Sequence, residues 1–218
     1  TVRLECHDGD SRADVVIRSS DVDRHLDTIL DPGNSTGRIE CDLTAYGATG
    51  PCAGRPDTDL QIQALSGIAD TTGSPDGPPV PIPLPLVEIM TGIYAAAAVV
   101  AAARVRRLSG AGQTIDMALF DCAFGAISTF LPKVLEGRSP DVKRVGNRHA
   151  MAAPWNVYRA RDGWALICSA SDVQWRRLCE VMGRDDLAGQ PGFATLSERV
   201  ANVSEVDAAL ASWVAGRD

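Results

Sequence analysis

The sequence predicts an α/β protein: a Rossmann-like parallel-sheet domain followed by a smaller α+β domain. An apolar, β-branched run at residues 13–17, a helical repeat at 20–30 and an alternating stretch at 38–47 indicate the first domain. Strand, helix and strand in this order are typical of a βαβ unit, whose two strands pair in parallel. A change of composition indicates the second domain, because all four tryptophans follow residue 154.

The composition excludes several classes of protein. Charged residues make up 22% of the 218 positions, and the net charge is −7 without the basic stripe of a nucleic-acid-binding surface. The longest apolar run, residues 93–103, is about half the length of a membrane span. No signal peptide is visible. We therefore expect a cytoplasmic protein that binds neither nucleic acid nor membrane.

The spacing of cysteine and histidine argues against a metal site. The six cysteines form no CxxC pair, and the three histidines lie far apart in the sequence. Because several cysteines fall within apolar patterns, we expect buried free thiols in a reducing compartment.

The loop after the second strand, residues 47–57, is rich in glycine and proline. Ligands bind at the carboxyl ends of the strands in open α/β sheets, so this loop is a candidate binding loop. It has neither the GxGxxG nor the P-loop pattern. We expect a helix next, at residues 60–70 and ended near Gly67, and then a turn cluster at residues 71–79.

A run of prolines at residues 78–85 precedes the longest expected helix. Proline is excluded from helix interiors, so we expect this run to be extended and the helix to span residues 91–108. Glu88 lies between the proline run and the expected helix. Gly110 or Gly112 would end the helix.

Three further segments complete the first domain and its boundary. A strand is expected at residues 113–119 and a helix at residues 120–137, which Pro132 should kink or break. The following stretch has no apolar periodicity. We therefore divide the chain into a large domain, a linker and a small domain, at residues 1–137, 138–154 and 155–218.

The small domain is expected to begin with a hairpin that turns at Asp162 and Gly163. An amphipathic helix at residues 172–182 would be capped by Asp172, and a last helix at residues 203–216 by Ser204.

A few polar residues are candidates for chemistry. Glu88 is either an acid that complements the dipole of the following helix or a nucleophilic carboxylate at the mouth of a cleft. Asp59 and Gln63 are one helical turn apart, so they are either an exposed helix start or a polar pair facing the loop that begins at Gly47. Arg55 is a loop arginine that can bind an anion. The residues alone leave these alternatives open.

Several motifs occur together in a fixed order: TAYGATGP, DLQIQALSG, TGSPDGPPVP, VEIMTGIYAAAAVVAAARVRRLSGAGQTIDMALFD and RVGNRHAMAAPWNVYRARDGWALICSASDVQWRRLCEVMGR. From about residue 13 to residue 218 the chain resembles the family III CoA-transferases, the CaiB/BaiF family. The resemblance implies a large Rossmann-like domain, a linker, a smaller domain, and two chains interlocked as rings. The chain resembles only the middle of such proteins, without their opening βα unit and returning C-terminal segment.

The resemblance also implies a mechanism. In the family an aspartate before the small-residue helix attacks an acyl-CoA thioester, and a mixed anhydride forms with release of CoA. The acceptor acid is then loaded through an enzyme–CoA thioester. Glu88 occupies that position here, with one more methylene. An acyl-CoA and a small carboxylic acid would be the partners, and the CoA thioester would be a substrate rather than a permanently bound cofactor.

The resemblance assigns roles to other residues as well. Asp59 and Gln63 would shape the catalytic pocket, and Gly47 and Arg55 would lie on the CoA side. In relatives the loop after the first strand contacts CoA with an Asn–aromatic pair; here that loop reads Ser19 and Ser20, which would also lie on the CoA side.

Three interpretations follow. The first is a CoA-transferase that works as a homodimer or with a relative as a heterodimer. The second is a catalytically degenerate partner subunit, suggested by Glu88 and by the segments that the resemblance does not include. The third is an acyl-CoA racemase, which is disfavoured because Thr58 stands where that branch places a histidine base.

The chain also departs from the transferases in one loop. Residues 146–153 are poorer in glycine than the loop that closes over the intermediate in the transferases.

Overall fold

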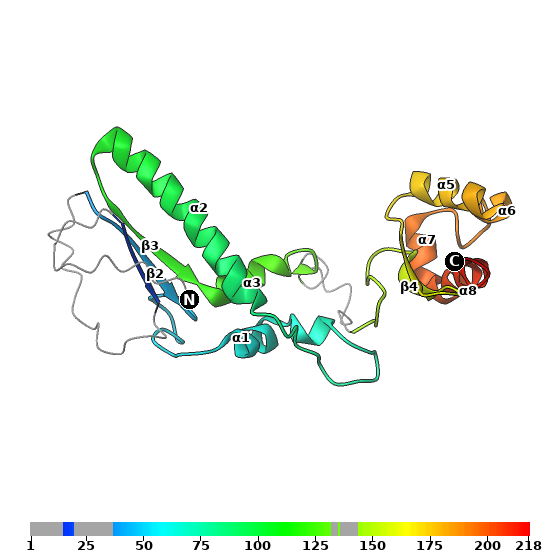
Figure 1. The fold of residues 1–218 in the computed structure, drawn as a ribbon, viewed down its shortest axis with the longest axis horizontal. Helices are drawn as coiled ribbons and strands as arrows, with labels where there is room; N and C mark the ends of the chain where they lie inside the picture. The colour runs from blue at the N-terminus through cyan, green and yellow to red at the C-terminus, as the bar shows by residue number, and fades with distance from the viewer. Residues whose placement is uncertain (1–14, 20–36, 132–134, 136–143) are drawn as a thin grey trace. The chain divides into compact units, whose positions relative to one another are not determined.

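A computed structural model describes residues 15–19, 37–131, 135 and 144–218 (Figure 1). The chain forms two compact units. The first comprises Thr1–Asp70 and Val80–Pro140, and the second comprises Thr71–Pro79 and Asp141–Asp218. The turn cluster at residues 71–79 therefore belongs with the second unit, where the N–H of Gly146 donates to the carbonyl of Gly73 (3.0 Å).

The first unit contains a parallel sheet. Its strands are β1 (Val15–Ser19), β2 (Ile39–Thr44) and β3 (Gln113–Ala118), in the order β1-β2-β3. All pairs are parallel, with Val15 opposite Ile39 and Ile39 opposite Gln113. The predicted α/β class and parallel pairing are confirmed. The helix expected at residues 20–30 lies outside the described residues.

The central strand β2 is the most buried of the three. Ile39 and Cys41 are fully buried, and Glu40 is 4% exposed. A buried carboxylate needs charged or hydrogen-bonding partners. Here Arg18 and Arg38 provide them, at 3.9 and 3.5 Å.

Two helices follow β2. The first, α1 (Asp59–Ser66), ends at Gly67 with φ of 91°, as predicted. A short 3-10 turn, η1 (Ala69–Thr71), follows it. The second is α2 (Leu86–Ser109), which lies along β2 and β3 (Figure 1). Its buried face carries small residues such as Ala95 and Ala102, which allow the close approach.

The expected start of α2 at Thr91 is wrong, because the helix already begins at Leu86. Pro85 is the N-cap residue, so the proline run ends where the helix begins. Proline is compatible with helix starts but not with helix interiors. Consequently Glu88 lies inside the first turn of α2. The helix ends at Gly110, whose φ is 74°, as predicted.

Helix α2 is long and apolar enough to cross a membrane by length and composition alone. Core helices of soluble proteins with the same length and composition are mostly buried, whereas 22% of the most apolar stretch of α2 is buried. In this structure α2 packs against β2, β3, α1 and α3, which is the arrangement of a helix in an α/β layer.

The third helix, α3 (Leu119–Ala126), follows β3 directly. It ends at Ala126, so the helix expected at residues 120–137 is interrupted, but before Pro132 rather than at that proline. Tight i to i+3 turns replace it, with Phe130 N–H donating to the carbonyl of Ile127 (2.9 Å). Gly125 and β-branched residues at this point favour the helix less than the preceding alanines do. Residues of the three helices form a core together with two residues from the loops next to β2 and α1: Ala45, Ile62, Ile68, Val87, Leu119 and Ala123.

The second unit starts with a hairpin. Strands β4 (Trp155–Arg159) and β5 (Trp164–Cys168) are antiparallel, with Arg159 opposite Trp164, which confirms the predicted turn. Four helices follow: α5 (Asp172–Met182), α6 (Asp185–Ala188), α7 (Leu196–Ala201) and α8 (Val203–Val214). Two of these, α6 and α7, are too short to show a clear repeat and were not predicted.

Both predicted caps in this unit are displaced. The N-cap of α5 is Ser171, whose hydroxyl accepts from the N–H of Gln174 (3.2 Å), and Asp172 is the first helical residue. The N-cap position of α8 is Asn202, so Ser204 lies within the helix. Sequence places a cap only to within a residue or two where several cap-forming residues are adjacent.

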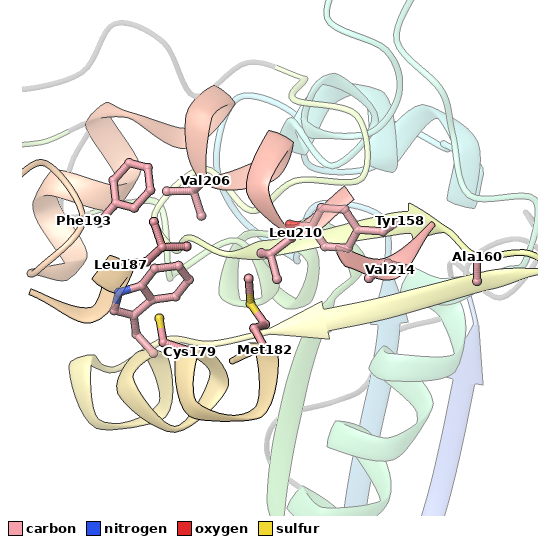
Figure 2. Close-up of a cluster of buried hydrophobic side chains, with 10 residues drawn as sticks. Tyr158, Ala160, Cys179, Met182, Leu187, Phe193, Val206, Leu210 and Val214 are labelled. Carbon is pink, nitrogen blue, oxygen red and sulfur yellow. The ribbon is translucent and has the colours of Figure 1, made fainter. Parts of the chain in front are cut away.

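The core of the second unit is formed by side chains from the hairpin and the helices (Figure 2). Cys179 and Met182 of α5 approach Leu210 of α8, and Tyr158 of β4 lies beside them. Asp207 is buried and accepts hydrogen bonds from Tyr158 (2.6 Å), Asn156 (2.9 Å) and Arg148 (2.6 Å). These bonds join α8 to strand β4 of the hairpin and, through Arg148, to the segment that precedes it.

Cysteine burial follows the local structure. Cys41, Cys122 and Cys179 are buried free thiols, as predicted, whereas Cys52 is intermediate. Cys168 is an exposed free thiol, so the prediction is wrong for this residue. It lies on β5, where successive side chains alternate between the two faces. Cys6 lies outside the described residues.

Candidate active site

The loop after β2 is anchored to the ends of two strands. The N–H of Gly47 donates to Thr44 Oγ1 (2.7 Å), and the N–H of Ala48 donates to Asp116 Oδ2 on β3 (2.9 Å). Gly47 has φ of 88°, a conformation that favours glycine. The loop thus has a fixed shape at the carboxyl edge of the sheet, where ligands of α/β proteins bind.

A cluster of three side chains lies in the same loop. Asp57 is 5% exposed; it accepts a hydrogen bond from the hydroxyl of Tyr46 and pairs with Arg55 Nε (3.0 Å). The guanidinium of Arg55 also lies over the Tyr46 ring, 5.5 Å from its centroid. These contacts orient Arg55 while its side chain stays 52% exposed. Arg55 is therefore a preorganised surface cation.

The environment of Tyr46 changes its acidity. Desolvation, followed by the hydrogen bond to Asp57, raises the pKa of Tyr46 to about 12. Tyr46 and Asp57 were not among the predicted site residues. The available signal was their position in the loop on either side of Arg55, which does not by itself indicate contact.

Asp59 and Gln63 are buried, with exposures of 6% and 0%. The alternative of an exposed helix start is therefore wrong. Gln63 Nε2 donates to Asp59 Oδ1. The remaining hydrogen bonds of the pair reach residues 82–88 of the proline run and α2, because Ile62 and the adjacent turn of α1 pack against that segment.

The side chains of both Gln63 and Asp59 form hydrogen bonds with backbone groups of that segment. The N–H of Ile82 donates to Gln63 Oε1 (2.8 Å), and Gln63 Nε2 is 3.2 Å from the carbonyl of Ile82. The N–H of Glu88 donates to Asp59 Oδ2 (2.9 Å). Asp59 and Gln63 of α1 are thus brought together with Glu88, which lies 29 residues after Asp59.

Glu88 itself is a surface residue at the start of α2. Its backbone is held by Asp59, whereas its side chain is exposed. The first turn of a helix favours a negative charge because its free N–H groups point toward it. An exposed carboxylate on a fixed backbone is suited to attack an electrophile from solvent or from a bound ligand.

The other predicted site residues belong to β1 and the loop after β2, and not to the group formed by Asp59, Gln63 and Glu88. Ser19 is the last residue of β1, at the carboxyl edge of the sheet, and Ser20 lies outside the described residues. Gly47 and Arg55 belong to the loop described above. Within the ranges that the structure describes, no group of three or more His, Cys, Asp or Glu side chains is arranged to hold a metal ion.

Residues 12–218 match the sequence profile of CoA-transferase family III. The chain belongs to this family. It is 37% identical over 169 residues to a succinate–glutarate CoA-transferase of Agrobacterium fabrum, covering 77% of this chain and 42% of the relative. It is 33% identical over 173 residues to a succinyl-CoA–L-malate CoA-transferase beta subunit of Chloroflexus aurantiacus, covering 78% of this chain and 43% of the relative.

Solved structures agree with the family assignment. A CaiB/BaiF family protein from Brucella suis superposes with a TM-score of 0.70 at 36% identity, covering 94% of this chain and 55% of that one. The resemblance inferred from the motifs is confirmed. The chain spans less than half the length of the two curated relatives named above.

Proposed function

We propose that this protein transfers CoA between an acyl-CoA thioester and a small carboxylic acid, with Glu88 as the nucleophile. The observation that carries the proposal is the state of Glu88: an exposed carboxylate in the first turn of α2, on a backbone held by buried Asp59. Membership of CoA-transferase family III supports this chemistry. The names of the relatives state it for those proteins.

The reaction would proceed through mixed anhydrides and an enzyme–CoA thioester on Glu88. A Glu88 oxygen attacks the thioester carbonyl, the C–S bond breaks, and CoA leaves as the thiolate with a mixed anhydride on Glu88. The thiolate then attacks the glutamyl carbonyl, which releases the donor acid and leaves an enzyme–CoA thioester. The acceptor carboxylate attacks that thioester, and CoA finally attacks the acceptor side of the new anhydride, which restores Glu88. No permanently bound cofactor is needed.

The loop after β2 would bind the CoA side. The protein has a net charge of −7, so an anionic cofactor-like substrate needs a local cation. Arg55 is such a cation, oriented by Asp57 and Tyr46. The positive φ of Gly47 fixes the loop beside β3, and Ser19, which Ser20 follows in the sequence, is the last residue of β1, the other strand that pairs with β2.

Glu88 also distinguishes this chain from the family pattern, which has an aspartate at this position. The longer side chain moves the carboxylate by about 1.5 Å, the length of one carbon–carbon bond. We propose that the pocket accommodates this length.

Trapping experiments test the nucleophile. After incubation with an acyl-CoA, hydroxylamine should convert the activated carboxyl of Glu88 to a hydroxamate, and mass spectrometry of peptides should locate it. Glu88→Gln should abolish both the adduct and CoA exchange. Glu205→Gln, in the first turn of α8, is the matched control and should leave both unchanged. Full exchange activity in Glu88→Gln would show that another residue is the nucleophile.

A second candidate function is a non-catalytic partner subunit. It is favoured by one relative being named a beta subunit. Purification of the chain alone, with its mass measured in solution, separates the candidates. Turnover by the isolated chain supports the transferase, whereas a chain that is soluble only with a full-length relative and that shows no turnover of its own supports the partner subunit.

The racemase branch remains the weakest candidate, because Thr58 is the N-cap residue of α1 and has no basic side chain. Deuterium incorporation at the α-carbon of an acyl-CoA in D₂O would detect that activity directly.

A further inference from the structure

We propose that Asp59 is a positioning residue: it caps α2 from the neighbouring helix and thereby fixes the nucleophile, without reacting itself. The proposal rests on the proposed role of Glu88. Asp59 is the first residue of α1, and its carboxylate accepts the N–H of Glu88, 29 residues later in the sequence.

Helix α2 lacks a cap of its own. The first N–H groups of a helix have no partner within the helix, and a Ser, Thr, Asp or Asn at the N-cap usually accepts from the second or third of them. The N-cap of α2 is Pro85, which offers no side-chain acceptor. Glu88 is the third helical residue, and Asp59 Oδ2 accepts its N–H at 2.9 Å. Asp59 therefore supplies from α1 the bond that Pro85 cannot.

Both oxygens of Asp59 are occupied. Oδ1 accepts from Gln63 Nε2, Oδ2 accepts from Glu88, and the residue is 6% exposed. A general base or a nucleophile needs an oxygen that can reach the substrate. Each carboxylate oxygen could accept a second hydrogen bond, but at 6% exposure neither oxygen of Asp59 is open to solvent, which favours a role in holding Glu88.

Gln63 extends the same support along the proline run. It is fully buried, accepts from the N–H of Ile82 (2.8 Å), and places Nε2 near the carbonyls of Ile82 (3.2 Å) and Leu84 (3.4 Å). The chain is thus held at Ile82, Leu84 and Glu88, with prolines restricting the residues between them. What stays adjustable is the Glu88 side chain itself.

This arrangement gives the extra methylene of Glu88 a specific consequence. A longer side chain has one more torsion and reaches more positions, so its productive geometry depends more on where its backbone begins. A displacement of about 1 Å can lower a rate on the order of 100-fold. Loss of the Asp59 bond should therefore reduce kcat rather than weaken acyl-CoA binding.

Two substitutions separate positioning from proton transfer. Asp59→Ala removes both acceptors and should lower kcat by about 10- to 100-fold, with KM for acyl-CoA changed less than about 2-fold. Asp59→Asn keeps one oxygen that can accept from Glu88, so it should lose clearly less than Asp59→Ala, and its pH–rate profile should keep the wild-type shape. Equal losses in both variants, with one limb of the profile missing, would overturn the proposal.

Amide hydrogen exchange provides a readout that needs no activity. In Asp59→Ala the N–H of Glu88 should exchange at least about 10-fold faster, because its acceptor is gone. The N–H of Gln174, capped by Ser171, is the internal control, and Asp185→Asn in α6 is the matched variant that should change neither amide. Unchanged exchange at Glu88 in both Asp59 variants refutes the cap, whatever the activity.

The two proposals fail in different ways. If the wild-type chain never forms a trapped adduct at Glu88, the nucleophile assignment fails, and the exchange experiment still decides whether Asp59 caps α2. If the adduct forms but the Asp59 variants turn over at the wild-type rate, the positioning role fails alone. If Asp59→Ala does not fold, the same comparisons are made with Asp59→Asn, whose single remaining bond predicts intermediate exchange and intermediate kcat.

Discussion

Replacement of Gln63 by leucine should destabilise the first unit strongly for a change that alters no charge. Leucine fills most of the same volume but makes no hydrogen bonds. The N–H of Ile82 then loses its acceptor and Asp59 Oδ1 loses its donor, both within a buried contact. Each buried group left without a partner costs about 1–3 kcal/mol. The free energy of unfolding should therefore fall by about 2–6 kcal/mol.

Urea denaturation followed by far-ultraviolet circular dichroism measures this loss. Gln61→Leu is the matched control, because Gln61 lies on the same helix, is exposed, and accepts only from Thr58 at the helix start. It should cost about 1 kcal/mol or less. All four tryptophans lie in the second unit, so their fluorescence reports that unit separately.

The comparison between the two glutamines decides the argument. Equal and small losses in Gln63→Leu and Gln61→Leu would refute it, since the bonds of Gln63 to the proline run would then contribute no more than a surface bond. A large loss confined to Gln63→Leu supports the view that the start of α2 is held from α1.

Two further changes address the loop after β2. Gly47→Ala should cost about 1–2 kcal/mol, because an alanine at φ of 88° is strained; an unchanged urea midpoint would contradict this. Tyr46 has its pKa raised from 10.0 to about 12, so its contribution to stability is complete below about pH 10 and declines as the pH rises toward 12. The stability of Tyr46→Phe should therefore fall less steeply than that of the wild type between these pH values, and parallel curves would contradict the shift.

Much of the fold was predictable from local patterns. The strands β1, β2 and β3 follow from apolar runs and alternation, and α1 and α2 end at glycines that sequence identifies directly. The hairpin turn at Asp162 and Gly163 was equally clear. These features depend on neighbouring residues alone, which a sequence displays in order.

The errors at the two helix ends have different physical causes. Local signals placed the start of α2 at Thr91, because the segment before it has prolines and no capping side chain. The cap comes from Asp59, which is distant in sequence, so no local pattern could reveal it. The end of α3 was misjudged because Pro132 was the most visible breaker, although the helix already ends at Ala126.

The sequence named the candidate residues but did not predict how they contact one another. The sequence pointed to Asp59, Gln63 and Glu88, but it suggested that the first two face the loop that begins at Gly47. Their hydrogen bonds instead reach the segment that carries Glu88. The contact of Tyr46 with Asp57 and Arg55 was missed because a loop has no periodicity from which neighbours can be inferred.

The early start of α2 makes the placement of Glu88 a property of the assembled unit rather than of its own segment. In a peptide of residues 78–112 the turn from Leu86 to Ile89 would lack the acceptor on α1, and helix would form from about Thr91 onward. Glu88 would then lie in the non-helical segment before the helix, and its backbone would have no fixed position. Helix α1 must therefore pack against the start of α2 before Glu88 is positioned as a nucleophile. Residues 78–112 placed in another protein without α1 would keep Glu88 but not its geometry.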